Sequence, residues 1–121
     1  MLHGLLLLES LTQLEVLQRL RITRTETWNV AHAAEYQPKV WTAISFEVDD
    51  DQADALAEEL SRTLKSPGWY IDARLNDKVY VIFPQRVFKY CKGDRAGQLE
   101  AQAYARAIGI PASQIDWETD A

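Results

Sequence analysis

Four basic residues lie close together in the last third of the chain. They are Arg86, Lys89, Lys92 and Arg95, and they surround Gly93. A helix is expected to begin just after them, and the free N–H groups of a helix start attract phosphate or carboxylate groups. This segment is therefore a candidate anion site. Because a single glycine does not make a phosphate-binding loop, the pattern favours the alternative of a solvated turn whose cations pair with nearby carboxylates.

A second candidate lies on a strand in which polar and apolar residues alternate. Its three polar side chains are Tyr70, Asp72 and Arg74. Their neighbours across the predicted hairpin are apolar: Val79, Val81 and Phe83. Such a face needs cover from a second subunit, another segment or a ligand. Asp72 could form a surface ion pair with Arg74, or lie in an apolar pocket and act as a general base. The sequence shows no second catalytic group, which favours a role without catalysis.

Metal and thiol chemistry find little support. One cysteine and two histidines allow no internal disulfide, and they cannot form a zinc site unless carboxylates complete it. We therefore expect no structural metal and no cofactor. Cations near Cys91 could make its thiol reactive, and the fold could bring His32 beside it, but we interpret it as the end of a strand. The run Asp49–Asp51 is typical of a helix start rather than of a metal site.

The net charge of −5 at pH 7 limits the kinds of partner that the protein is expected to bind. An acidic surface repels phosphate backbones, so nucleic acid is not an expected partner. Aromatic residues could line a ligand pocket, but in a small sheet they more often fill the core. The aromatic set considered for this role is Trp28, Trp41, Trp69, Tyr70, Tyr80, Phe88, Tyr90 and Trp117.

The leucine run Leu5–Leu8 is too short for a membrane span and has neither a basic segment before it nor a cleavage site after it. We expect no membrane association and a cytoplasmic location. His3–Glu9 then predicts a buried strand, although it could also begin a longer helix. Ser10 would cap a helix over Leu11–Leu20. Arg21–Trp28 predicts a polar edge strand with Ile22, Arg24, Glu26 and Trp28 on one face.

Val40–Val48 gives the clearest strand pattern, followed by a helix from Asp49–Asp51 to Leu64. Trp69–Leu75 and Lys78–Phe83 predict a hairpin around Asn76-Asp77, in which Leu75, Ala73 and Ile71 face Lys78, Tyr80 and Ile82. After Pro84, Arg86–Tyr90 either extends this strand or forms another. A last helix, capped by Asp94, covers Arg95–Ile108, and the tail docks through Ile115 and Trp117.

These elements predict one α+β domain over residues 1–121. We expect a two-layer sandwich with a mainly antiparallel sheet and helices on one face. The order β-α-β-β-α-β of the first six elements matches the ferredoxin-like unit. A second assignment places that unit at Val40–Trp117, with the tail as its last strand.

Several motifs in the last two-thirds of the chain are distinctive. They are QPKVWT (Gln37–Thr42), GWYID (Gly68–Asp72), VYVIFPQRVFKY (Val79–Tyr90), KGD (Lys92–Asp94), GIP (Gly109–Pro111) and DW (Asp116-Trp117). Together they resemble a group of small uncharacterised bacterial proteins. That resemblance implies that the segments form one unit, and it implies no activity.

The favoured hypothesis is a non-catalytic homodimeric module that binds a small anionic ligand or a protein partner. The half-apolar second sheet face and the local cations motivate it. One alternative is a small enzyme that uses Asp72 or Tyr70 for proton transfer in a pocket on that face. The other is a purely structural protein.

Overall fold

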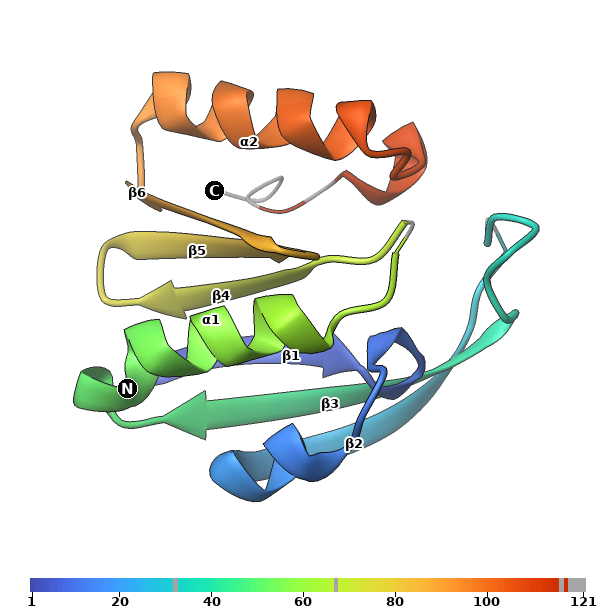
Figure 1. Cartoon of the computed structure of the whole chain (residues 1–121), viewed down its shortest axis with the longest axis horizontal. Coiled ribbons are helices and arrows are strands. Elements are labelled where there is room, and N and C mark those ends of the chain that lie inside the picture. Colours follow the sequence, from blue (N-terminus) through green and yellow to red (C-terminus); the bar gives the residue numbers. More distant parts are fainter. Residues whose placement is uncertain (32, 67, 116, 118–121) are drawn as a thin grey trace.

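The computed structural model describes residues 1–31, 33–66, 68–115 and 117. In this part of the chain, six strands form one antiparallel sheet in the order β2-β3-β1-β4-β5-β6 (Figure 1). The strands are β1 (Leu2–Leu7), β2 (Arg21–Asn29), β3 (Val40–Val48), β4 (Ile71–Leu75), β5 (Lys78–Phe83) and β6 (Arg86–Cys91). The α-helices are α1 (Ala53–Thr63) and α2 (Arg95–Ala107). The predicted α+β class with a mainly antiparallel sheet is confirmed.

Helix α1 packs on what we call the first face of the sheet. Side chains alternate along a strand, so Leu2 and Leu6 of β1 point toward α1 together with Tyr80 and Ile82 of β5. A Cβ on Gly4 would lie only 2.6 Å from the Phe46 ring. The missing side chain at this position therefore lets the first-face core close over β1.

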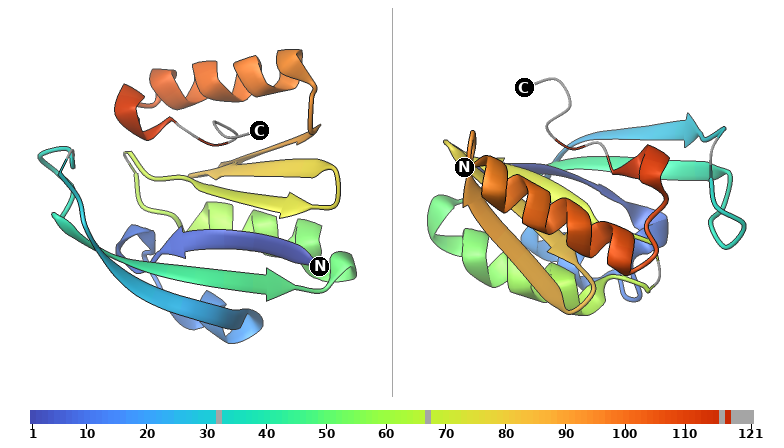
Figure 2. Two further views of the ribbon diagram at one scale, coloured as in Figure 1. Left: turned by 180° about the vertical axis from the view of Figure 1, so that it is seen from behind. Right: turned by 90° about the horizontal axis from the view of Figure 1, so that it is seen from above.

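Helix α2 packs on the opposite, second face, so the prediction that the helices share one face is wrong. Val79, Val81 and Phe83 are completely buried there, in a cluster with Ala101 and Ala105 of α2. In the view from behind, α1 lies behind the sheet and α2 runs along the margin formed by β6 (Figure 2). We predicted that a second subunit, another segment or a ligand covers these apolar side chains. In the structure a later segment of the same chain covers them. Burial of these side chains is the driving force for that docking.

The hairpin at Asn76-Asp77 has the predicted register. Ala73 pairs with Tyr80, and Asp72 pairs with Val81 on the other face. Asn76 has a φ of 54°, the positive value that such tight turns require. After Pro84 the chain turns again at Gln85, whose φ is 66°, and β6 pairs back onto β5 as a separate strand.

The predicted helix over Leu11–Leu20 is wrong. The structure has two short 3₁₀ helices there, η1 (Leu8–Ser10) and η2 (Glu15–Arg19). The chain between them pairs with the segment after α1: the Thr12 N–H donates to the Thr63 carbonyl, and the Lys65 N–H donates to the Ser10 carbonyl. Backbone groups used in this way cannot form a helical ladder. The Ser10 hydroxyl donates backward to the Leu7 carbonyl at 2.6 Å instead of capping a helix.

The predicted facing of β2 is wrong at its first half. A bulge between Ile22 and Arg24 sets Ile22 opposite Phe46 and Arg24 opposite Ser45. Ile22 therefore belongs to the first face, and Arg24, Glu26 and Trp28 belong to the second. A bulge adds one unpaired residue, and simple alternation does not anticipate it.

Acidic residues lie at the starts of both α-helices and act differently at each. Asp94 caps α2 as predicted, because its carboxylate accepts from the Gly97 N–H at 3.1 Å. At α1 a 3₁₀ turn, η3 (Asp50–Gln52), precedes the helix and no side-chain cap bond forms, contrary to expectation. Asp50 instead pairs with the N-terminal ammonium group of Met1, and the negative charges there still suit the start of a helix.

The C-terminal segment docks on the second face through the buried Trp117, as predicted. This segment forms a 3₁₀ turn, η4 (Ala112–Gln114), and adds no strand to the sheet within the described residues. The second assignment, in which the ferredoxin-like unit covers Val40–Trp117 and the tail is its last strand, is therefore wrong. Among the described residues, no helix is long and apolar enough to span a bilayer.

Candidate functional site

The second face of the sheet has two halves. Helix α2 and the segment that follows it cover β5 and β6, while β1, β3 and β2 carry no helix on this side (Figure 2). Between them runs an open groove of about 610 Å³. Its lining residues are His3, Gly4, Leu5, Thr23, Ser45, Phe46, Asp72, Ala73, Arg74 and Trp117. We call this feature the open groove.

Asp72 and Arg74 line the open groove from β4, as the sequence predicted for one face of that strand. The Arg74 Nη1 donates to an Asp72 carboxylate oxygen at 3.1 Å and also lies 3.4 Å from the Ala73 carbonyl oxygen. The Arg74 side chain is 34% exposed, and the Asp72 side chain is 36% exposed. Asp72 thus lies beside a guanidinium at a partly hydrated surface, and not in the apolar pocket that a general base with a raised pKa would need.

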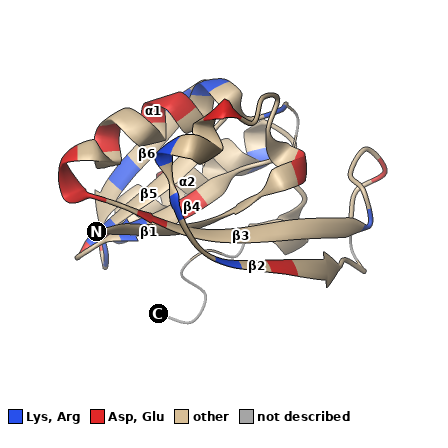
Figure 3. Cartoon of the chain, turned by 90° about the horizontal axis from the view of Figure 1, so that it is seen from below, with Lys and Arg blue, Asp and Glu red and all other residues tan. Residues whose placement is uncertain are grey.

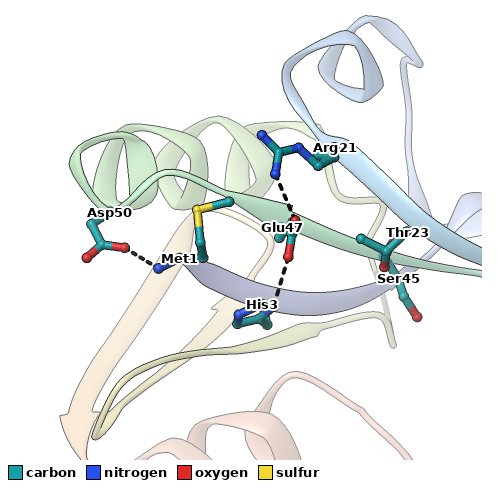
Figure 4. Close-up of polar contacts among 7 residues, drawn as sticks. All are labelled: Met1, His3, Arg21, Thr23, Ser45, Glu47 and Asp50. Atoms are coloured by element: carbon teal, nitrogen blue, oxygen red, sulfur yellow. Dashed lines mark hydrogen bonds and ion pairs between the residues drawn. The ribbon is translucent and has the colours of Figure 1, made fainter.

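A cluster from three strands adds further polar groups at the same end of the sheet (Figure 4). The Glu47 carboxylate receives a hydrogen bond from Arg21 Nη1 at 3.0 Å, and its second oxygen lies 3.5 Å from His3 Nδ1. The Thr23 hydroxyl donates to the Ser45 carbonyl at 3.3 Å. The sequence did not indicate this cluster, because only the strand order brings β1, β2 and β3 side by side.

Tyr70 belongs to the covered half rather than to the groove. Its hydroxyl donates to the Gln114 carbonyl at 2.5 Å, and its ring meets the edge of Trp117 at 5.0 Å. Both contacts fasten the C-terminal segment to the sheet. The hydroxyl is therefore engaged in packing this segment, which is a structural task.

The four predicted cations do not converge. Arg86 stacks over the rings of Phe88 and Tyr104 at 4.6 and 5.2 Å, which is a cation–π arrangement. Lys89 points to the first face, where α1 lies. Lys92 and Arg95 are exposed, and the only side-chain hydrogen bond described for Arg95 goes to Gln98 of its own helix at 3.0 Å. Moreover, the Asp94 carboxylate occupies the start of α2, where a bound anion would sit.

Lys89 instead forms a small cluster with Tyr80 and Asp54. The Tyr80 hydroxyl donates to Asp54 Oδ1 at 2.7 Å, and Lys89 Nζ lies 3.2 Å from the same oxygen. The Tyr80 hydrogen bond, together with that from Lys89, lowers the pKa of Asp54. Burial, followed by the bond to Asp54, raises the pKa of Tyr80. At neutral pH these shifts favour an ionised Asp54 and a neutral Tyr80.

The structure gives the Cys91 thiol a cationic neighbour, and the described part of the chain gathers no cluster of metal ligands. Cys91 is exposed at the end of β6, with Lys78 Nζ 3.6 Å from its sulfur. His32, which the sequence suggested as a possible neighbour, lies outside the described residues. Among those that are described, no three His, Cys, Asp or Glu side chains gather closely enough to hold a metal ion.

Comparison with protein-family models, with curated proteins and with solved structures finds no match to this chain.

Proposed function

We propose that the protein is a non-catalytic binding module and that the open groove takes a small anionic ligand. The observation that carries this proposal is the groove itself, a concave surface of about 610 Å³ that brings polar side chains from β1, β2, β3 and β4 around one space. Because the groove is open rather than enclosed, it suits contact with one polar end of a small molecule and not burial of a whole ligand.

The donors of the groove favour an anionic group on the ligand. Both contacts that the described residues make with Arg74 use Nη1, which leaves the donors of its other two nitrogens for a carboxylate or phosphate. His3 is 64% exposed on its side chain and lies on the same lining. Trp117 offers an apolar wall for the rest of the ligand. The net acidity of the chain does not oppose this, because the potential inside a groove is set locally.

The enzyme alternative has less support. Asp72 is paired with a guanidinium, and the Tyr70 hydroxyl bonds to a backbone carbonyl under the C-terminal segment. Neither group is placed as a general base with a positioned partner. The original reason for expecting a dimer, a bare apolar half of the second face, is also gone, because α2 covers Val81. A homodimer therefore needs another surface.

The test is a thermal-shift series with phosphate, citrate and other small organic acids and phosphorylated metabolites. A ligand that binds only the native state raises the melting temperature. We expect a shift that Arg74→Gln abolishes. The control is Arg95→Gln, which removes an exposed cation outside the groove and should keep the shift. If no anion shifts the wild type, or if both variants lose the shift equally, the proposal fails.

We further propose that the first four strands form a ferredoxin-like unit. In support, the order β2-β3-β1-β4 is the one that a β-α-β-β-α-β unit of this kind has, with η2 in the place of its first helix and on the same face as α1. The hairpin β5–β6 and α2 would then be an extension. The resemblance to small bacterial proteins and a cytoplasmic location remain proposals as well.

A further inference from the structure

Strand β2 is an open edge of the sheet. It has nine residues, contains no proline, and is exposed along most of its length, whereas an average strand has about five or six residues. No strand in the described part of the chain pairs with its outer side. Figure 3 shows it at the margin of the molecule, with basic and acidic positions along it. A long unpaired edge of this kind is a template for pairing with another chain, here in the part that follows the bulge.

We propose that the partner of this edge is a second copy of the same strand, paired antiparallel about Thr25. A twofold axis through Thr25 sets Thr25 against itself and Arg24 against Glu26 of the other copy. Both charged residues lie on the second face, and a twofold axis perpendicular to the sheet keeps them on that face. The pairing therefore brings two oppositely charged pairs together, which is favourable across neighbouring strands.

Other registers are disfavoured by the same residues. Moving the axis by one residue sets Glu26 against Glu26, or Arg24 against Arg24, and like charges directly opposite each other are destabilising. A half-step would place residues of the first face opposite residues of the second, which side-chain alternation forbids. Of the registers centred between Arg24 and Glu26, only the one about Thr25 is left.

The charges are available for this contact. Within one chain Arg24 Nε lies 2.9 Å from Glu26 Oε1, and the two side chains are 69% and 41% exposed. In the dimer each carboxylate would lie between two guanidinium groups, so that four charges of alternating sign form one network. Networks of this kind contribute more than isolated surface pairs.

A contact through one strand is small. Interfaces of this size belong to weak, reversible complexes, so the dimer should form at micromolar or higher concentration and weaken with salt. The bulge at Ile22 limits the regular pairing to the part of the strand that follows it. This dimer does not require a ligand in the open groove, and its failure would leave the proposed function untouched.

The main experiment is sedimentation over a range of concentrations at low salt. We expect the wild type to dimerise and Glu26→Arg to raise the dissociation constant about tenfold or more, since it opposes like charges twice. Arg24→Glu should act in the same way. The double variant Arg24→Glu/Glu26→Arg restores opposite charges at both positions and should recover the dimer.

A second experiment reads the register directly, in a background where Cys91→Ser removes the exposed native thiol. Residues on a twofold axis lie next to their own copies, within the distance that a disulfide spans. Thr25→Cys should therefore crosslink under mild oxidation much faster than Thr27→Cys, whose counterpart in this register is Thr23. A monomer at every concentration, a dimer that Glu26→Arg leaves unchanged, or a double variant that stays monomeric would each overturn the inference.

Discussion

The two halves of the second sheet face are built from different strands of one sheet and differ in what covers them. Under α2, the side chains of Val79, Val81 and Phe83 are completely buried. On the open half, Thr23 of β2 is exposed and Ser45 of β3 is partly exposed. One half is a dry core, and the other is partly hydrated where the open groove lies, although Trp41 and Ala43 on the same face of β3 are buried.

Strand β4 is the border between the halves. Asp72 and Arg74 face the open groove, while Tyr70, which comes just before the strand, holds the C-terminal segment over the covered half. The difference indicates that stability is concentrated on one side of this border and that binding groups lie on the other. Substitutions on the two sides should therefore have separable effects.

The largest effect should come from Phe83→Ala in the covered half. The Phe83 ring has zero exposure and lies 5.1 Å from the Tyr104 ring and 5.6 Å from the Phe88 ring. Truncation leaves a cavity, and such changes typically cost about 3–5 kcal/mol. Urea denaturation followed by circular dichroism measures this loss of unfolding free energy.

The matched substitution in the open half is Ser45→Ala. This side chain is partly exposed, and the contact with Thr23 uses the Ser45 carbonyl, which the change keeps. The unfolding free energy should stay within about 0.5 kcal/mol of the wild type. Equal losses for the two variants would show that the two halves do not differ as described.

The contrast between the halves also shows how far the sequence reaches. Alternation is a local property, and it correctly predicted the β4–β5 hairpin with Asp72 on one side and Ala73 on the other. The turn at Asn76-Asp77 was predicted for the same reason, since only two residues have to suit it. The acidic cap of α2 at Asp94 is likewise local.

What the sequence did not give depends on distant contacts. No pattern within Arg95–Ala107 says which face of the sheet its alanines will meet, so α2 was placed on the wrong side. The pairing of Leu11 with Leu64 removed a predicted helix, and the bulge beside Ile22 reversed part of β2. The groove shares this origin, because His3 and Thr23 meet only through the strand order.

A smaller effect should follow from Gly97→Ala at the docking surface of α2. Alanine in a helix is usually about 1 kcal/mol more favourable than glycine. Here, however, a Cβ would lie 2.7 Å from the Tyr90 Cβ, an atom that cannot move without its strand. We expect overpacking to outweigh propensity and to leave a net loss of about 1–2 kcal/mol.

Chemical denaturation measures that loss, with Glu100→Ala as the control on the exposed side of the same helix. The control should change stability by less than about 0.5 kcal/mol. Hydrogen exchange adds a second readout, since amides of α2 should lose more protection than those of β1 and β3. A Gly97→Ala protein more stable than the wild type would mean that α2 does not pack closely on β6.

A smaller effect than that of Gly97→Ala should come from the ion pair at the border. Asp72→Asn, Arg74→Gln and the double variant form a thermodynamic cycle that isolates the Asp72–Arg74 interaction. The two side chains are about one-third exposed, so water and salt screen their attraction, and the coupling should be about 0–1 kcal/mol. It should fall further in high salt, because screening acts on exposed charges. A coupling above about 2 kcal/mol that salt leaves unchanged would place this pair in a dry environment, and the border would then belong to the covered half.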